Sequence, residues 1–145
     1  MNTIIIFVWI WLSLLAMSIW EASVEGRNSW DKGKCGPKIK IFGVVLSTYH
    51  FFLAWIMLPM LIIGLPLIII GWSLSLFGVL LSAYLSGLVI EDFGWYVVNP
   101  KVKLKELYTP FSDYYPWVKI NKKKIIPWFY IIGIAFAVLI FVLTR

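Results

Sequence analysis

The residues of this chain that could do chemistry are four acids and one histidine, all set in or beside apolar segments. They are Glu21, Glu25, His50, Glu91 and Asp92. A charged side chain at the centre of a membrane helix costs about 2.5–3.5 kcal/mol, and less near the helix ends. We therefore expect an interaction that offsets this cost. Carboxylates combined with one imidazole suit a divalent iron, manganese or zinc ion.

Helical spacing indicates which of these side chains can meet. Glu21 and Glu25 are four residues apart and share one helix face. The helix face expected around His50 carries small residues, so we expect His50 to point toward a neighbouring helix. At 1.5 Å per residue, His50 lies ~13 Å and Glu91 ~10 Å from the same membrane edge. We therefore predict that three acids and the imidazole converge just inside that edge.

Asp92 is the fifth candidate ligand, but it is turned by ~100° from Glu91 around the helix. We therefore expect the two acids to serve different neighbours. Tyr84 and Trp95 share the helix face of Glu91, and Asn99 ends the same segment before a proline. These three residues are expected to support the ligands.

Three alternatives to a metal site remain open. A buried carboxyl group can exchange protons near neutral pH, as acids and histidines do in pumps. A single histidine can simply be hydrogen-bonded to a neighbouring helix. The metal site itself would differ from that of di-iron bundles, because the chain has no Glu-x-x-His pair. The acids can also form interfacial ion pairs with basic residues nearby in sequence, namely Arg27, Lys38, Lys40 and Lys101.

Several chemistries are excluded by composition. The chain has one cysteine, Cys35, so neither an internal disulfide nor a cysteine-based zinc site can form. One histidine excludes a bis-histidine haem within the chain. The sequence has no phosphate-binding glycine loop, no GxSxG, no HExxH and no dinucleotide fingerprint. The sequence leaves open whether the chain is an enzyme.

The elements that must position these residues are membrane spans. The 145-residue chain is 61% hydrophobic, whereas soluble domains are usually ~45–50% apolar. Residues 41–90 contain no Lys, Arg, Asp or Glu, and a span needs about 20 apolar residues, so this stretch holds two spans. We expect residues 64–66 to form the turn between them. The prediction is an all-α, single-domain, integral membrane four-helix bundle with spans at residues 3–25, 41–63, 67–98 and 125–144.

Basic residues are concentrated in two loops, at residues 26–40 and 99–124, and the net charge is +6. The positive-inside rule therefore predicts a multi-pass protein of the cell membrane with cytoplasmic loops and both termini outside. Lysines beside a membrane attract anionic headgroups, and we favour this partner over nucleic acid. The lysines expected to contact headgroups are Lys101, Lys103, Lys105, Lys122, Lys123 and Lys124.

Residues 90–100, with the sequence IEDFGWYVVNP, resemble a motif of a family of small, uncharacterised prokaryotic four-helix membrane proteins. That motif reads aliphatic-Glu-Asp-Phe-x-Trp-aromatic-Val-x-Asn-Pro. The resemblance covers these eleven residues and, more loosely, the aromatic loop that leads to a last helix beginning with a proline. It implies that Glu91, Asp92, Trp95 and Asn99 act as one unit, and it assigns them no role.

The function favoured by these patterns is the binding of a divalent metal ion, or the relay of protons, by the acids and His50. The alternative is a non-catalytic accessory or assembly subunit of a larger membrane complex. Small size, nine tryptophans and a serine and glycine stripe in residues 75–86 motivate that alternative. Either function is compatible with other membrane subunits or a homo-oligomer as partners.

Overall fold

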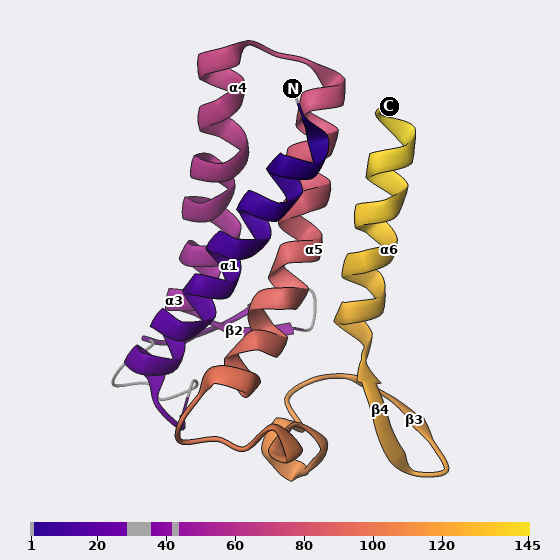
Figure 1. Cartoon of the computed structure of the whole chain (residues 1–145). Coiled ribbons are helices and arrows are strands. Elements are labelled where there is room, and N and C mark those ends of the chain that lie inside the picture. The colour runs from indigo at the N-terminus through magenta and orange to yellow at the C-terminus, as the bar shows by residue number, and fades with distance from the viewer. Residues whose placement is uncertain (1, 29–35, 42–43) are drawn as a thin grey trace.

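The computed structural model describes residues 2–28, 36–41 and 44–145, which are mostly helical and form four helical columns (Figure 1). Cys35 and the other residues outside these ranges are not described. Three of the columns are long and apolar enough to cross a membrane. They are α1 (Thr3–Glu25), the column Thr48–Ile70 and α5 (Leu74–Val98), and the fourth column is the shorter α6 (Trp128–Leu143).

The second column begins at Thr48, so the predicted start at residue 41 is wrong. Residues before it form an antiparallel hairpin, which consists of β1 (Lys38–Ile41) and β2 (Val44–Ser47). Ile and Val dominate this hairpin, and their branched side chains favour strands. Ser47 then caps the helix, because its Oγ accepts the His50 backbone N–H at 3.2 Å.

The predicted turn at residues 64–66 is also wrong, because the second column continues to Ile70. The column consists of α3 (Thr48–Phe51), two π-helical segments (Phe52–Met57 and Met60–Gly64) and α4 (Leu65–Ile70). Pro66 lies in the first turn of α4, where a missing N–H is tolerated. The turn instead lies at Gly71, whose φ of 101° suits glycine. Ser73 then caps α5, with its Oγ accepting the Leu76 N–H at 3.3 Å.

Helix α5 lies between α1 and α6 and packs against both (Figure 1). Glycine allows α1 to approach closely. A Cβ atom at Gly87 would lie 2.4 Å from Leu14 Cδ1, and one at Gly94 would lie 2.7 Å from Ser18 Oγ. The same Ser18 hydroxyl donates to the Glu91 carbonyl at 2.7 Å. This contact fixes the position of Glu91, which is on α5, relative to α1.

The chain between α5 and α6 is compact. It contains two short 3-10 helices, Leu104–Tyr108 and Pro110–Ser112, and an antiparallel hairpin of β3 (Trp117–Ile120) and β4 (Lys123–Pro127). Asn121 and Lys122 form the hairpin turn, both with positive φ. Because residues 123–127 pair with β3, α6 begins at Trp128, and the predicted start of the last span at residue 125 is wrong.

Candidate metal centre

The structure brings together three of the five predicted ligands. Glu21 and Glu25 lie one turn apart at the C-terminal end of α1, and His50 lies in α3 at the start of the second column. One ligand atom from each residue lies within 4.8 Å of the others. His50 Nε2 is 2.9 Å from Glu25 Oε1. Such a group is compatible with a divalent metal ion.

The carboxyl groups of this cluster are withdrawn from the surface. Glu21 is 6% exposed and Glu25 is 2% exposed. Burial of an ionised carboxyl is costly unless the charge is paired or bound to a metal. The two residues are four apart on one helix, so both carboxyl groups lie on the face that α3 approaches. The arrangement therefore concentrates negative charge at one point, next to the only imidazole in the sequence.

Two residues that the sequence analysis did not assign to the site hold its side chains in place. The Ser47 side chain is hydrogen-bonded to His50 Nδ1, which leaves Nε2 directed at Glu25. The Tyr49 hydroxyl donates to Glu21 Oε1 at 3.2 Å. Hydrogen bonds to the ring nitrogen opposite the ligand nitrogen are the usual way in which proteins orient a metal-binding histidine. The sequence signal for Ser47 is its place three residues before His50, at a helix start.

Glu91 brings a third carboxyl group to the cluster, from α5. Its side chain lies beside that of Glu21. Two carboxyl groups can hydrogen-bond only if they share a proton, because two ionised groups repel each other. Of the predicted convergence of three acids and one histidine, the structure shows Glu21, Glu25 and His50 within metal-ligand distance of one another, with Glu91 of α5 beside Glu21.

Trp95 lies one turn beyond Glu91 and closes the cluster on the α5 side. The residue is 5% exposed. Its indole nitrogen lies near the Glu25 carboxyl. Within the described part of the chain, however, this nitrogen has no hydrogen-bond partner at normal distance and angle. A buried polar group without a hydrogen bond is uncommon in proteins. Trp95 thus directs a donor toward Glu25.

Asp92 does not belong to this cluster, in contrast to the prediction that it could be a ligand. It accepts hydrogen bonds from two tyrosines, at 2.7 Å from Tyr115 and at 2.5 Å from Tyr130. Burial raises the pKa of the Tyr115 hydroxyl, so this group stays protonated and donates. Both carboxylate oxygens of Asp92 are thereby occupied. The expectation that Glu91 and Asp92 serve different neighbours is confirmed.

The two other predicted supporting residues hold helices rather than ligands. The Tyr84 hydroxyl donates to the Ala54 carbonyl and so joins α5 to the second column. The Asn99 amide donates to the Gly26 carbonyl at 2.8 Å, and its Oδ1 accepts the Lys101 N–H at 2.9 Å. Asn99 therefore fixes the end of α1 against the start of the following loop.

One of the basic residues considered as a counter-ion for the cluster binds elsewhere. Arg27 forms a two-pronged ion pair with Glu106, at 3.2 Å for Nη1–Oε1 and 2.5 Å for Nη2–Oε2. Its Nη1 also donates to the Lys101 carbonyl at 3.0 Å. The Arg27 guanidinium holds the pKa of Glu106 below its usual value. This pair joins the end of α1 to the loop and leaves the carboxyl groups of the cluster to other partners.

The lysines predicted to contact headgroups differ in exposure. Lys101, Lys103, Lys105, Lys122 and Lys123 are exposed. Lys124 instead folds back, with its Nζ 2.7 Å from Asp113 Oδ1 and 3.2 Å from Ser112 Oγ. Its ammonium group also lies over the Trp117 ring. Lys124 therefore helps to hold the β3–β4 hairpin against the loop that precedes it.

Ser47, His50 and Glu25 form a continuous series of polar contacts, which has the composition of a nucleophilic triad. In such a triad the serine must reach a substrate carbonyl. Ser47 is 1% exposed, and its oxygen also caps α3. A substrate cannot reach that oxygen, so the series orients His50 and does not form a serine nucleophile.

No family model, no curated protein and no solved structure matches the chain. Fold and site alone define the class: a mostly helical protein with three helices apolar and long enough to cross a membrane. At one end of these helices it carries a Glu–Glu–His group within metal-ligand distance.

Proposed function

We propose that the chain is a multi-pass protein of the cell membrane, with both termini outside and its two basic segments in the cytoplasm. Three apolar helices of 23, 23 and 25 residues support insertion. Both termini lie at one end of the bundle, and the hairpin with Lys122 and Lys123 lies at the other (Figure 1). The basic end then faces the cytoplasm, and its exposed lysines lie near anionic headgroups.

We further propose that Glu21, Glu25, His50 and Glu91 bind a divalent iron, manganese or zinc ion. The observation that carries this proposal is the convergence of two α1 carboxylates and one α3 imidazole within 4.8 Å. Four ligands at ~2.1 Å from a tetrahedral ion lie ~3.4 Å apart. The 2.9 Å contact between His50 and Glu25 therefore has to open by about 0.5 Å to admit the ion.

The side chains around the cluster suit this role. The Ser47 hydroxyl can accept a hydrogen bond from the Nδ1–H group that a histidine coordinating through Nε2 must carry. Tyr49 orients Glu21, and the Trp95 indole faces Glu25. An ion would remove the repulsion between the carboxyl groups. The proposal is a binding function, and it does not assign a reaction.

Metal content of the detergent-purified protein tests this proposal. Near-stoichiometric metal is expected in the wild type, and loss of that metal is expected in Glu25→Gln and in His50→Ala. Asp92→Asn is the matched control, because it removes an acid that is adjacent to Glu91 and faces away from the cluster. If the wild type holds no metal after incubation with Fe²⁺, Mn²⁺ and Zn²⁺, the proposal is wrong.

A second candidate function is proton transfer, which the contact between Glu21 and Glu91 favours. A carboxyl pair that shares one proton can take up a second proton or release the one that it holds. This candidate needs no metal. It predicts that Glu91→Gln abolishes pH-driven proton flux in reconstituted vesicles, while a metal-binding protein without a proton path shows no flux in either form.

A further inference from the structure

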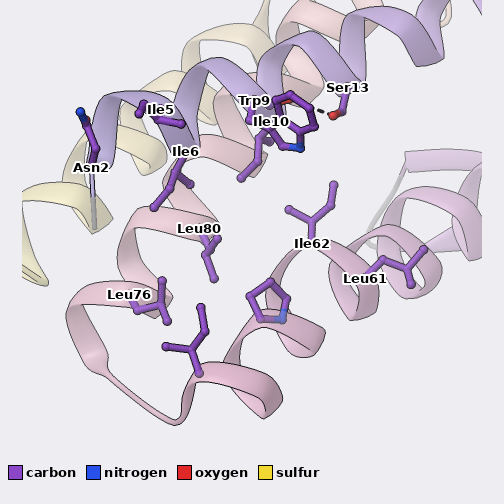
Figure 2. Close-up of a pocket in the computed structure, with 12 residues that line it drawn as sticks. Asn2, Ile5, Ile6, Trp9, Ile10, Ser13, Leu61, Ile62, Leu76 and Leu80 are labelled. Atoms are coloured by element: carbon purple, nitrogen blue, oxygen red, sulfur yellow. Dashed lines mark hydrogen bonds between the residues drawn. The ribbon is translucent and has the colours of Figure 1, made fainter.

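A groove of about 610 Å³ lies at the end of the bundle away from the acidic cluster, between α1, the second column and α5 (Figure 2). Its floor is formed by the buried side chains of Ile10, Leu76 and Leu80. Its walls include the exposed side chains of Trp9 and Leu61. The groove therefore opens sideways, toward the hydrocarbon of the proposed bilayer.

The lining of the groove offers hydrocarbon contacts and almost no free polar atoms. Its side chains with polar atoms are Asn2, Ser13 and Trp9, whose indole has one N–H group. Asn2 is an exposed residue at the end of the groove, and its Oδ1 accepts the Ile4 N–H at 3.0 Å. The Ser13 hydroxyl donates to the Trp9 carbonyl at 2.8 Å (Figure 2). A polar ligand would lose its hydrogen bonds to water without replacement, so the groove suits a purely apolar occupant.

The length and position of the groove match one leaflet of a bilayer. It follows α1 from Asn2 to Ser13, which is ~16 Å at 1.5 Å per residue. Half of the hydrocarbon core of a bilayer is about 15 Å thick. A groove that spans one leaflet and opens sideways has the shape of a site for a single extended acyl chain.

A positive charge lies at the same end. Arg145 is the only basic residue of the sequence outside the two basic loops. Its Nη2 donates to Thr3 Oγ1 at 2.9 Å, and its guanidinium lies over the Phe141 ring, 4.4 Å from the centroid, so the cation lies between the first turn of α1 and the end of α6. Arginine binds phosphate oxygens well. Arg145 does not itself line the groove, but its partner Thr3 follows Asn2, which lines the end of the groove, so a cation lies near that end.

We propose that this groove holds one acyl chain of a phospholipid of the outer leaflet, whose phosphate group binds Arg145. The proposal rests on the membrane insertion and the orientation proposed above, but it is independent of the metal site. The bound lipid fills the space between α1 and the second column. This lipid is therefore part of the packed structure and not part of the bulk lipid.

Native mass spectrometry of the detergent-purified chain tests the proposal. One phospholipid per chain is expected to remain bound after detergent washing that removes bulk lipid. Ile62→Trp fills the groove and is expected to eliminate this retained lipid. The control is Ile68→Trp, which places the same ring on an exposed position of the same column, and the lipid should remain. Arg145→Gln should lower the retained fraction by about tenfold.

A measurement on the wild type keeps the test valid if a variant fails to fold. A phospholipid with a photoreactive acyl chain should crosslink mainly to residues 5–10 and 61–62. Equal labelling of Ile68 overturns the proposal, as does a wild type that retains no lipid. A retained second chain in place of lipid also overturns it, because the groove is then an interface between copies. A chain that leaves the membrane without detergent overturns insertion itself, which is a separate failure.

Discussion

Replacing Ser47 by alanine should weaken metal binding without touching a ligand. The Ser47 hydroxyl contacts His50 Nδ1 and also accepts the His50 backbone N–H at 3.2 Å. Without metal, the ring can carry its proton on Nε2, facing Glu25 at 2.9 Å. With metal on Nε2, the proton must move to Nδ1, and Ser47 is the acceptor that stabilises it there.

The size of the effect follows from the burial of Ser47. Ser47 is 1% exposed, so water does not replace its hydroxyl in the variant. A buried N–H without a partner costs about 1–3 kcal/mol. That cost falls mainly on the metal-bound form, because in the free form the ring can keep its proton on Nε2 and Nδ1 loses only a hydrogen bond that it accepts. We therefore expect Kd to rise about 10–100-fold, which is the range observed for such outer partners of metal ligands.

A competition titration with a chromophoric chelator measures this change in the detergent-solubilised protein. Ser73→Ala is the control, because it removes a cap of the same type from α5, at the opposite end of the bundle. Each variant should lose about 1 kcal/mol of stability from the missing cap. Only Ser47→Ala should lose metal affinity. Equal Kd values for the wild type and Ser47→Ala, or an equal loss in Ser73→Ala, would refute the reasoning.

Two further predictions concern packing and charge. Gly87→Ala would place Cβ 2.4 Å from Leu14 Cδ1 and should cost about 1–3 kcal/mol of stability. Gly64→Ala is the control, because its nearest contact would be at 3.9 Å, and it should not show this cost. Thermal unfolding in detergent compares the two variants. The folded-state pKa of Glu106 is lowered, mainly by its hydrogen bond to Arg27. The pair therefore stabilises the fold at pH values above the unfolded-state pKa of Glu106, and this stabilisation is lost as the pH falls through the folded-state pKa. A carboxyl NMR titration of Glu106 should therefore give a midpoint below its usual value, and a normal midpoint would contradict the pairing.

The number of helical columns could be predicted from the sequence, because long uncharged runs have few alternatives to helices. The limits of the second column could not. Two prolines and Gly64 favoured a break at residues 64–66, yet the column tolerates Pro59 and Pro66 beside its π-helical segments. The glycine that makes the turn, Gly71, lies in a stretch with no proline, and only its positive φ identifies it.

Helical spacing predicted the core of the site for a related reason. Glu21 and Glu25 share a face in any α-helix that contains them, so the pair did not depend on the exact helix ends. His50 was predicted as a mid-helix residue and is instead in the first turn of α3. That shift explains why Ser47 was not expected to hydrogen-bond the ring. Nor could spacing have predicted the contact of Tyr49 with Glu21, which depends on how two separate helices pack.

The partners of Asp92 show where spacing alone stops being informative. A rotation of ~100° from Glu91 predicts a different neighbour, but it does not say which one. Tyr115 comes from a loop without regular periodicity, and Tyr130 comes from a helix that starts three residues later than predicted. Adjacent acids on α5 therefore have separate tasks: Glu91 faces the proposed metal and Asp92 holds the loop and α6. It follows that a substitution at Glu91 should act on metal content, whereas the adjacent substitution at Asp92 should act on stability alone.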